Sequence, residues 1–255
     1  MKVSIITVNK DNAIGLEETI KSVVFQTFTD FEFIIIDGNS TDNSINIIEK
    51  YSNNITYWVS ESDNGIFHAM NKGIRQAKGE YVIFMNSGDC FLSKETLMNV
   101  FSKETQADLL AGNVIMDGKR IRQKRRLPQK ITFYYFWTNT IHHQGTFIKR
   151  NLFDEIGLYD ESLKVSSDWI FFLLAIVKYN KSIEILEEYI ALRQPNGIAS
   201  SKEAAAWSKE IRDVTIQKYF PYFYDDYKNY HKLKRFTFTR LKKHIIWRLQ
   251  YILRG

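Results

Sequence analysis

The stretch "YVIFMNSGDCF" (81–91) begins with apolar and aromatic residues and changes character halfway along. Residues 81–85 are all apolar or aromatic, whereas residues 86–89 carry no apolar side chain. The first part has the composition of a buried strand. We therefore expect Asn86 and Asp89 to lie at an edge of a sheet. The residues at the ends of the other strands indicate which kind of ligand that edge binds.

Three further segments in the first ninety residues have the same composition. They are "VSIITV" (3–8), "FEFIIID" (31–37) and "ITYWVSE" (55–61). Helical patterns lie between the strand segments, at residues 16–26, 42–51 and 66–78. Most of these strands are apolar on both alternating sets of positions, as parallel strands covered on two faces are. The alternation of strands and helices predicts a doubly wound, mostly parallel α/β sheet of Rossmann-like type.

Each of these strands ends in polar side chains. The first ends near Thr7 and Asn9, the second at Asp37, and the third leads into Asp63. Because ligands of open parallel sheets bind beyond the carboxyl ends of the strands, we expect Asp37, Asp63 and Asp89 to meet in one place. Clustered carboxylates favour a cation such as Mg²⁺ or Mn²⁺, or hydrogen-bond donors of a ligand. Taken singly, such residues also cap helices or form turns, which is the alternative interpretation.

The second half of the chain is less regular. Residues 112–123, "GNVIMDGKRIRQ", predict a hairpin that turns at Asp117-Gly118. Residues 141–150, "IHHQGTFIKR", alternate like a strand, and a long amphipathic helix is expected to begin near Asp168. Six of the eight residues 119–126 are Lys or Arg, which makes this hairpin strongly basic.

The composition excludes several classes of protein. The single cysteine, Cys90, rules out an internal disulfide and fits a reducing compartment. The longest apolar run covers residues 169–177, far less than the roughly 20 residues of a membrane span, and no signal peptide is visible. We therefore expect a cytoplasmic protein. The sequence "NKDNAIG" after the first strand matches neither a dinucleotide-binding motif nor a P-loop, which disfavours both kinds of nucleotide site.

The positive charge is concentrated near the C-terminus. The chain has a formal charge of +6, but nine Lys and Arg residues and no acidic residue follow Asp226, so residues 1–226 alone carry −3. Residues 228–255 interleave these cations with Leu, Phe, Trp and Ile, a pattern typical of helices that bind anionic membrane surfaces. The alternative is a solvated helix that packs its apolar stripe on the body. No recognition motif supports nucleic-acid binding.

Four segments taken in order resemble the family 2 glycosyltransferases of the GT-A fold. They are "VSIITVNK", "SVVFQTFTDFEFIIIDGNSTD", "ESDNGIFHAMNKGI" and "GEYVIFMNSGDCF". The resemblance spans residues 1–92 and continues more weakly through "HHQGTFIKRNLFDEIGLYDE" to "SSDW". It implies a GT-A domain over 1–200, with a nucleotide-sugar half (1–92) and an acceptor half (93–200). A basic helical segment over 201–255 would follow this domain.

The resemblance also implies an activity. A sugar would move from a nucleotide diphosphate donor, a UDP-sugar, to a hydroxyl of a saccharide or lipid-linked saccharide, with inversion at the anomeric carbon. Such enzymes build bacterial envelope polysaccharides and glycolipids, so the chain would work on the inner face of the cell membrane as a peripheral protein. The partners implied are the donor, the acceptor and, through residues 228–255, an anionic membrane surface.

By position in the family, donor-binding roles fall to a set of residues near the strand ends. These are Thr7, Asn9, Asp37, Asp63, Asn71, Lys72 and Asn86. Residues 86–89 stand where the family commonly has Asp-x-Asp-Asp, and here only Asp89 keeps its carboxylate. Asp89 would be the main protein ligand of Mn²⁺ or Mg²⁺, and Asn86 would bind ribose or offer a neutral oxygen. Fewer anionic ligands predict weaker metal affinity in the absence of the donor.

On the acceptor side, the resemblance points to Asp168 in "KVSSDWIFF" as the general base that removes the proton of the acceptor hydroxyl. An aspartate at this place also fits a helix N-cap. Asp160 and Glu161 are weaker alternatives that fit a turn better. The family position of Asp168 decides between these three carboxylates.

His143, Gln144 and Trp169 would complete the acceptor side. The resemblance puts His143 and Gln144 at the acceptor edge of the site, with a core histidine as the alternative for His143. His142 and His143 would point to opposite faces of a strand and therefore could not chelate one ion. Trp169 would either stack on a sugar or belong to the core.

Two rival functions remain open from the sequence. A nucleotidyltransferase would also use a doubly wound sheet, carboxylates and a divalent metal, but it should carry a glycine-rich phosphate loop that "NKDNAIGLEE" lacks. A non-catalytic GT-A protein that only binds nucleotide sugar is supported by the reduced motif at 86–89. Release of pyrophosphate from nucleoside triphosphates would support the first rival.

Overall fold

The computed structural model describes residues 1–118, 121–194 and 201–234. The chain divides into two compact units, Met1–Ser208 and Lys209–Gly255. Residues 235–255, which hold most of the basic segment expected at a membrane, lie outside the described residues. Among the residues that are described, no helix is both long and apolar enough to cross a membrane.

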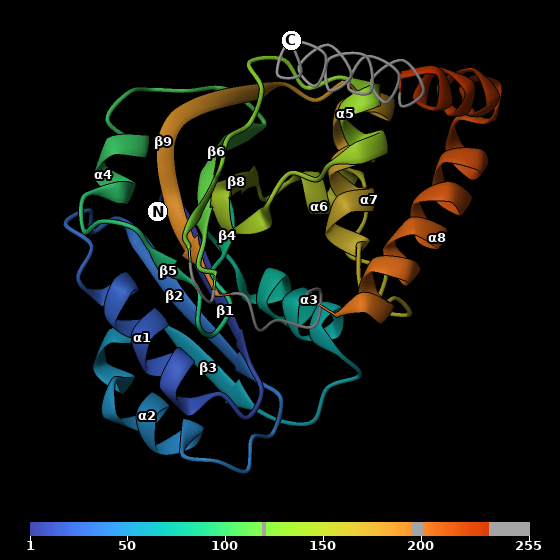
Figure 1. Ribbon diagram of the computed structural model, residues 1–255. Coiled ribbons are helices and arrows are strands. Elements are labelled where there is room, and N and C mark those ends of the chain that lie inside the picture. The colour runs from blue at the N-terminus through green and yellow to red at the C-terminus, as the bar shows by residue number, and fades with distance from the viewer. Residues whose placement is uncertain (119–120, 195–200, 235–255) are drawn as a thin grey trace, which may run out of the picture. The chain divides into compact units, whose positions relative to one another are not determined.

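The first ninety residues form the expected alternation of strands and helices (Figure 1). The strands are β1 (Val3–Asn9), β2 (Phe31–Asp37), β3 (Tyr57–Ser60) and β4 (Tyr81–Phe84), and the helices are α1 (Ala13–Val24), α2 (Ser44–Lys50), the short η1 (Ser52–Asn54) and α3 (Ile66–Gln76). Strand β1 pairs in parallel with β2 and with β4, and β2 pairs in parallel with β3. Their carboxyl ends therefore share one edge, where the register sets Asn9 beside Asp37.

The second half extends this sheet. Its elements are β5 (Cys90–Phe91), α4 (Thr96–Val100), β6 (Leu109–Met116), β7 (Gln123–Arg125), α5 (Phe133–Thr138), η2 (His143–Gly145), β8 (Thr146–Lys149), α6 (Leu152–Glu155), α7 (Ser167–Leu173), η3 (Leu174–Lys178) and β9 (Ile183–Arg193). Over the described residues the sheet has the order β3-β2-β1-β4-β8-β6-β9-β5, with β7 paired to β6. Strand β8 is antiparallel to β4 and to β6, so the sheet is mixed.

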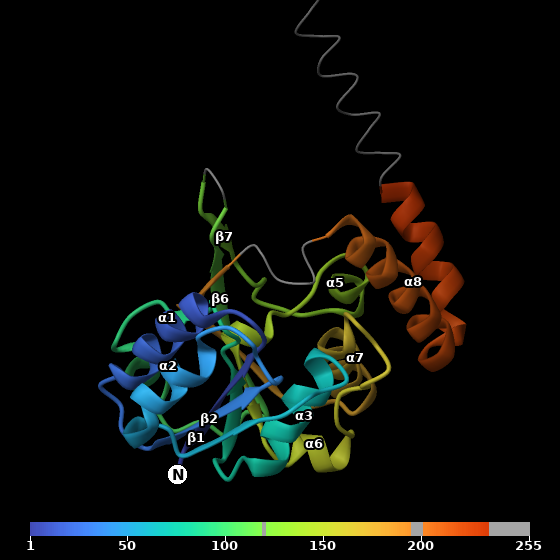
Figure 2. The same cartoon turned by 90° about the horizontal axis from the view of Figure 1, so that it is seen from below.

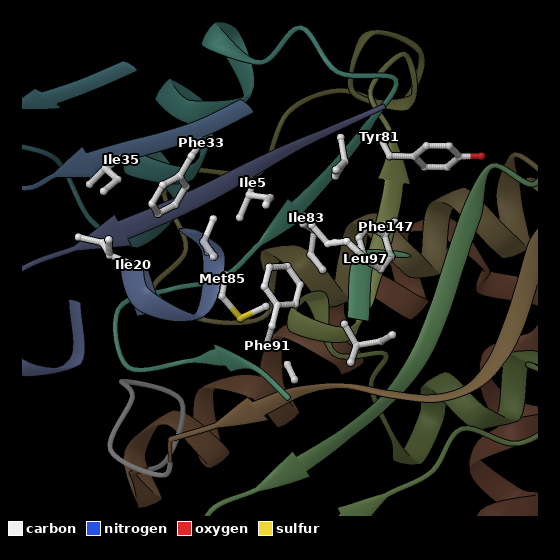
Figure 3. Close-up of a cluster of buried hydrophobic side chains, with 14 of the residues drawn as sticks. Ile5, Ile20, Phe33, Ile35, Tyr81, Ile83, Met85, Phe91, Leu97 and Phe147 are labelled. Atoms are coloured by element: carbon white, nitrogen blue, oxygen red, sulfur yellow. The ribbon is translucent and has the colours of Figure 1, made fainter. Parts of the chain in front are cut away.

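Both faces of the parallel strands are covered by helices. Helices α1 and α2 lie on one face of β1–β3, and α3 lies on the other (Figures 1 and 2). Figure 3 shows the core on the first face, where Ile20 of α1 meets Ile5, Phe33 and Ile35 of the sheet. This double cover explains why the strands are apolar on both sets of alternating positions.

The structure corrects two expectations for the second half. The hairpin is present as β6–β7, but Met116 pairs with Gln123, so the connection covers 117–122 rather than a two-residue turn. Residues 141–150 are only partly a strand, because η2, a 3₁₀ helix, precedes β8. The expectation that His143 lies on a strand is therefore wrong. A Cβ on Gly145 would lie 2.9 Å from the carbonyl oxygen of Gly112, so glycine is required where η2 lies alongside β6.

The helix expected near Asp168 begins one residue earlier, as α7, and continues into the π-helical turn η3. Helix α8 (Lys202–Tyr219) follows β9 in the chain. A second helical stretch covers 221–234, beginning at Pro221. Proline disfavours a helical conformation in the residue before it, which explains the interruption at Phe220.

Candidate functional site

Asp37 is the most strongly hydrogen-bonded side chain at the ends of the parallel strands. Its carboxylate is buried and accepts hydrogen bonds from Ser40 N (2.8 Å), Ser40 Oγ (2.6 Å), Ser60 Oγ (2.7 Å) and Asn9 Nδ2 (2.7 Å). Burial opposes ionisation, but these hydrogen bonds outweigh it and hold the pKa of Asp37 below its ordinary value. Asp37 is thus a fixed negative charge at this edge.

Thr7 and Asn9 link the strand ends to one another. Thr7 is 0% exposed, and its hydroxyl donates to the carbonyl of Met85 at 2.7 Å. Asn9 Nδ2 also donates to Ser44 Oγ at 2.9 Å, while the buried Asn9 Oδ1 has no hydrogen-bond partner within the described residues. The predicted contacts of these two residues with a nucleoside stay predictions, and Asn9 Oδ1 is the atom with an acceptor to offer.

Asp63 lies against the loop that follows Asp37. Its Oδ1 accepts a hydrogen bond from Gly65 N at 2.9 Å, and a Cβ on Gly38 would lie 2.5 Å from its Oδ2. Lys10 Nζ donates to the carbonyl of Gly38 at 2.8 Å, so a cation lies beside the same loop. The structure therefore puts Asp63 beside the residue that follows Asp37. The predicted meeting of Asp37, Asp63 and Asp89 in one place stays a prediction.

Asn71 and Lys72, on α3, make contacts within the protein. Asn71 is buried, donates to the carbonyl of Tyr159 at 2.9 Å and to Glu161 Oε1 at 2.8 Å, and accepts from Tyr159 N at 3.0 Å. Lys72 pairs with Glu61 at 2.8 Å. Asn71 thus ties α3 to the loop before α7, and Lys72 stays near the end of β3.

Asp89 joins the motif at 86–89 to the second half of the chain. It is 6% exposed, and its carboxylate accepts hydrogen bonds from Gln144 Nε2 and from Gln194 N, both at 3.0 Å. Burial raises the pKa of Asp89 above its ordinary value despite these hydrogen bonds. Gln144 was expected at the site, whereas Gln194 was missed because only the pairing of β9 with β5 brings it there.

A chain of hydrogen bonds runs from Asn86 through His143 to Asp168. Asn86 Nδ2 lies 3.3 Å from His143 Nε2, and His143 Nδ1 lies 2.8 Å from Asp168 Oδ2. With Asp168 ionised, Nδ1 carries the proton and Nε2 accepts from the amide of Asn86. Burial opposes ionisation of Asp168, but the hydrogen bond from His143 outweighs it, and the pKa of Asp168 lies below its ordinary value.

Trp169 and Asp160 are two further residues that the sequence proposed for the acceptor side. Trp169 is 1% exposed, and its indole N–H donates to the carbonyls of Phe136 (3.2 Å) and Asn139 (3.1 Å). This corrects the assignment of Trp169 to the acceptor side, because its ring is enclosed in the core. Asp160 accepts from Ser162 in a turn, as its alternative interpretation predicted.

The donor set for a divalent ion is small. Within the described residues, no group of three or more His, Cys, Asp or Glu side chains is placed to hold a metal. The buried Asn86 Oδ1 has no partner there, and Asp89 is the carboxylate three residues on. These are hard oxygen donors that fit Mn²⁺ or Mg²⁺ when substrate phosphates and water complete the coordination.

Comparison with known sequences matches residues 3–159 to the family model described as "Glycosyl transferase family 2". A PGL/p-HBAD biosynthesis glycosyltransferase of Mycobacterium tuberculosis is 30% identical over 174 residues, which are 66% of this chain and 67% of that protein. An uncharacterized glycosyltransferase of the same organism is 29% identical over 230 residues, covering 86% of each.

Comparison with solved structures gives a similar fold at lower identity. Residues 1–349 of S. aureus TarS in complex with UDP have a TM-score of 0.66 and 23% identity, covering 85% of this chain and 66% of that chain. The mannosyltransferase PcManGT of Pyrobaculum calidifontis, in complex with GDP-Man and Mn²⁺, has a TM-score of 0.60 and 17% identity, covering 83% and 60%. The chain thus spans about two thirds of the length of these structures or less.

Proposed function

Because the chain belongs to glycosyl transferase family 2, we propose that this glycosyltransferase moves a sugar from a UDP-sugar to a hydroxyl of a saccharide or lipid-linked saccharide, with inversion. The family, the GT-A fold and the class of enzyme predicted from the sequence are confirmed. A nucleotide diphosphate donor is supported by the TarS complexes with UDP and UDP-GlcNAc and by the PcManGT complex with GDP-Man. We favour UDP because the UDP-bound structures have the higher TM-scores and identities.

The edge formed by β1, β2 and β3 suits the nucleoside. A uracil ring offers an N–H donor and a ribose offers hydroxyl groups, so both need fixed acceptors. Asp37 supplies a carboxylate there, Asp63 adds a second one beside Gly38, and Asn9 Oδ1 is a buried acceptor without a partner in the described residues. The diphosphate would then lie toward residues 86–89.

The observation that carries the proposal is the chain Asn86–His143–Asp168. Through His143, it links Asn86 of the donor-side motif to the Asp168 carboxylate on the acceptor side. In the reaction, the acceptor oxygen attacks the anomeric carbon while Asp168 takes the hydroxyl proton. The bond from that carbon to the diphosphate breaks through an oxocarbenium-like transition state, and the nucleoside diphosphate leaves.

His143 keeps Asp168 ionised, as removal of the acceptor proton requires. Its hydrogen bond fixes one carboxylate oxygen and lowers the pKa of Asp168, so the carboxylate is ionised at neutral pH. Mn²⁺ or Mg²⁺, held by Asp89 and Asn86, would supply positive charge for the leaving diphosphate. The acceptor belongs to an envelope polysaccharide or glycolipid precursor, in keeping with the relative named for PGL/p-HBAD biosynthesis.

A screen of nucleotide sugars tests this function. A ligand that binds the native state raises its melting temperature, so UDP and UDP-sugars with Mn²⁺ should raise it more than GDP or NAD does. UDP release from the best donor should then be measurable after addition of a lipid-linked saccharide extract. An equal response to NAD, or release of pyrophosphate from nucleoside triphosphates, would contradict the proposal.

A further inference from the structure

The basic hairpin β6–β7 has no part in the reaction described above. Strand β7 is exposed, and it extends with the end of β6 beyond the rest of the sheet (Figure 2). Its cations divide between two faces because side chains alternate along a strand. Lys124 lies over the ring of Tyr189, and Arg126 donates to the hydroxyl of the same tyrosine at 2.8 Å. Arg125 therefore belongs to the opposite face.

Arg125 shares its face with a second arginine, Arg193 at the end of β9. Arg125 pairs with Val114, and Arg193 pairs with Met116, two positions further along β6, so the register puts both arginines on one face. Each has a neutral partner: Arg125 donates to Gln123 Oε1 at 2.9 Å, and Arg193 donates to Met116 Sδ at 3.5 Å. Within the described residues, neither forms an ion pair with a carboxylate.

This face is also the face of the candidate site. Strand β8 occupies the edge of β6 at Leu109–Ala111 and β7 occupies it at Val114–Met116, with η2 between them. A Cβ on Gly145 of η2 would lie 2.8 Å from Val114 Cγ1, so the side chain of Val114, and with it that of Arg125, is on the side of η2. Gln194, which holds Asp89 through its N–H, directly follows Arg193.

The positive charges of the two arginines affect the pKa values of residues at the site. The pKa of His142 is lowered to about 4, chiefly by burial, and the charges of Arg193 and Arg125 contribute to this decrease. Arg193 also favours the ionised form of Asp89. Two arginines that form no ion pair within the described residues thus act on residues of a site whose motif keeps one carboxylate where the family commonly has three, which leaves this end of the site suited to an anion.

We propose that Arg125 and Arg193 bind a phosphate group of a substrate at the outer edge of the site, next to Asp89. The guanidinium group binds phosphate oxygens in a fixed two-pronged geometry, and both groups reach one face of the sheet. The inference rests on the proposed function, because that function supplies phosphate from two sources. One is the diphosphate of the donor, and the other is the phosphate that links a saccharide acceptor to its lipid.

Calorimetric titrations of the full chain distinguish these sources. UDP is titrated first, uridine serves as the probe without phosphate, and inorganic pyrophosphate is then titrated onto protein saturated with UDP. The variants are Arg125→Gln and Arg193→Gln, and Lys124→Gln is the matched control on the opposite face of the same strand. Circular dichroism melts of each variant exclude unfolding as a cause.

If the donor is the source, each arginine variant should weaken UDP binding about tenfold or more and leave uridine binding unchanged. If the acceptor is the source, UDP binding should stay at the wild-type level, and pyrophosphate binding to the UDP complex should weaken by a similar factor. The Lys124 variant should match the wild type in both titrations. Arginine variants that behave like the Lys124 variant in both would overturn the inference, whereas a wild-type protein that binds no UDP would instead contradict the proposed function.

Discussion

Asp168 is ionised at neutral pH although its surroundings oppose a buried charge, because His143 donates to it at 2.8 Å. Asp168→Asn keeps the shape of this side chain and the hydrogen bond from His143, but it removes the proton acceptor. We expect kcat for sugar transfer to fall by about 10²- to 10⁴-fold while UDP affinity changes by less than about threefold. UDP-release kinetics and calorimetry measure the two quantities.

The matched control for this change is Asp160→Asn, on an exposed turn eight residues earlier. It should retain wild-type kcat within about twofold, because the exposed side chain of Asp160 accepts hydrogen bonds from the neighbouring Ser162 and the change leaves its backbone contacts in place. A wild-type rate in the Asp168 variant, or an equal loss in the Asp160 variant, would remove Asp168 from the role of general base.

Asp37 stabilises the fold through its charge. Its pKa is lowered in the native state, so its contribution is fully present above the pKa of the unfolded chain and is lost as the pH falls through the native pKa, below the ordinary 3.8. Asp37→Asn should lower the free energy of unfolding by about 1.5–3 kcal/mol at neutral pH, and the difference from wild type should shrink in acid. Urea titrations across this pH range measure it.

The control for Asp37 is Asp30→Asn, because the Asp30 side chain is 62% exposed and makes one long contact with the N-terminal amine. Its free energy of unfolding should stay within about 0.5 kcal/mol of wild type at every pH. A gap between the Asp37 variant and wild type that stays constant with pH would show that its hydrogen bonds, rather than its charge, stabilise the fold.

At the scale of elements, the contact between α3 and β1 depends on a residue without a side chain. A Cβ on Gly73 would lie 2.4 Å from Ile6 Cγ2. Helix propensity alone predicts that Gly73→Ala stabilises α3 by about 1 kcal/mol, but overpacking against the sheet should reverse the sign and destabilise the protein by about 1–3 kcal/mol. Urea unfolding of the variant measures the change.

A double-mutant cycle with Ile6→Ala separates the two effects, since that change removes the Cγ2 atom. The double variant should be more stable than the sum of the single changes predicts. Additive effects, or a Gly73→Ala protein more stable than wild type, would contradict this account of the packing.

The sequence predicted β1–β4 and α1–α3 because each has a clear local pattern of apolar residues. It predicted the second half less well because the structure there depends on long-range contacts. Part of the predicted strand is the 3₁₀ helix η2 instead, with Gly145 close to Gly112 of β6, which changes the surroundings of His143. In the site, the polar strand ends were predictable, but the partners of Asp89 were not, since Gln194 lies 105 residues away in sequence.

At the scale of the whole molecule, the uneven charge leads to a prediction about membranes. Nine cations and no acidic residue follow Asp226, and each basic residue near an anionic surface contributes about 1 kcal/mol to binding. The full chain should therefore sediment with vesicles that contain anionic lipid at low salt and not with neutral vesicles. High salt and deletion of residues 228–255 should each abolish the binding.

The deletion variant also controls for the basic hairpin at 119–126. Vesicle binding that survives the deletion would assign the membrane contact to another surface. Equal binding to neutral vesicles would show that charge does not drive it.

The central claim is that the carboxyl ends of β1, β2 and β4 hold a nucleotide diphosphate. A crystal structure grown with saturating UDP and Mn²⁺ tests it most directly. We predict the uracil and ribose beside Asp37 and Asp63 and the diphosphate beside Asp89. UDP bound at any other place, or density for UDP at none of these residues under saturating conditions, would contradict the account.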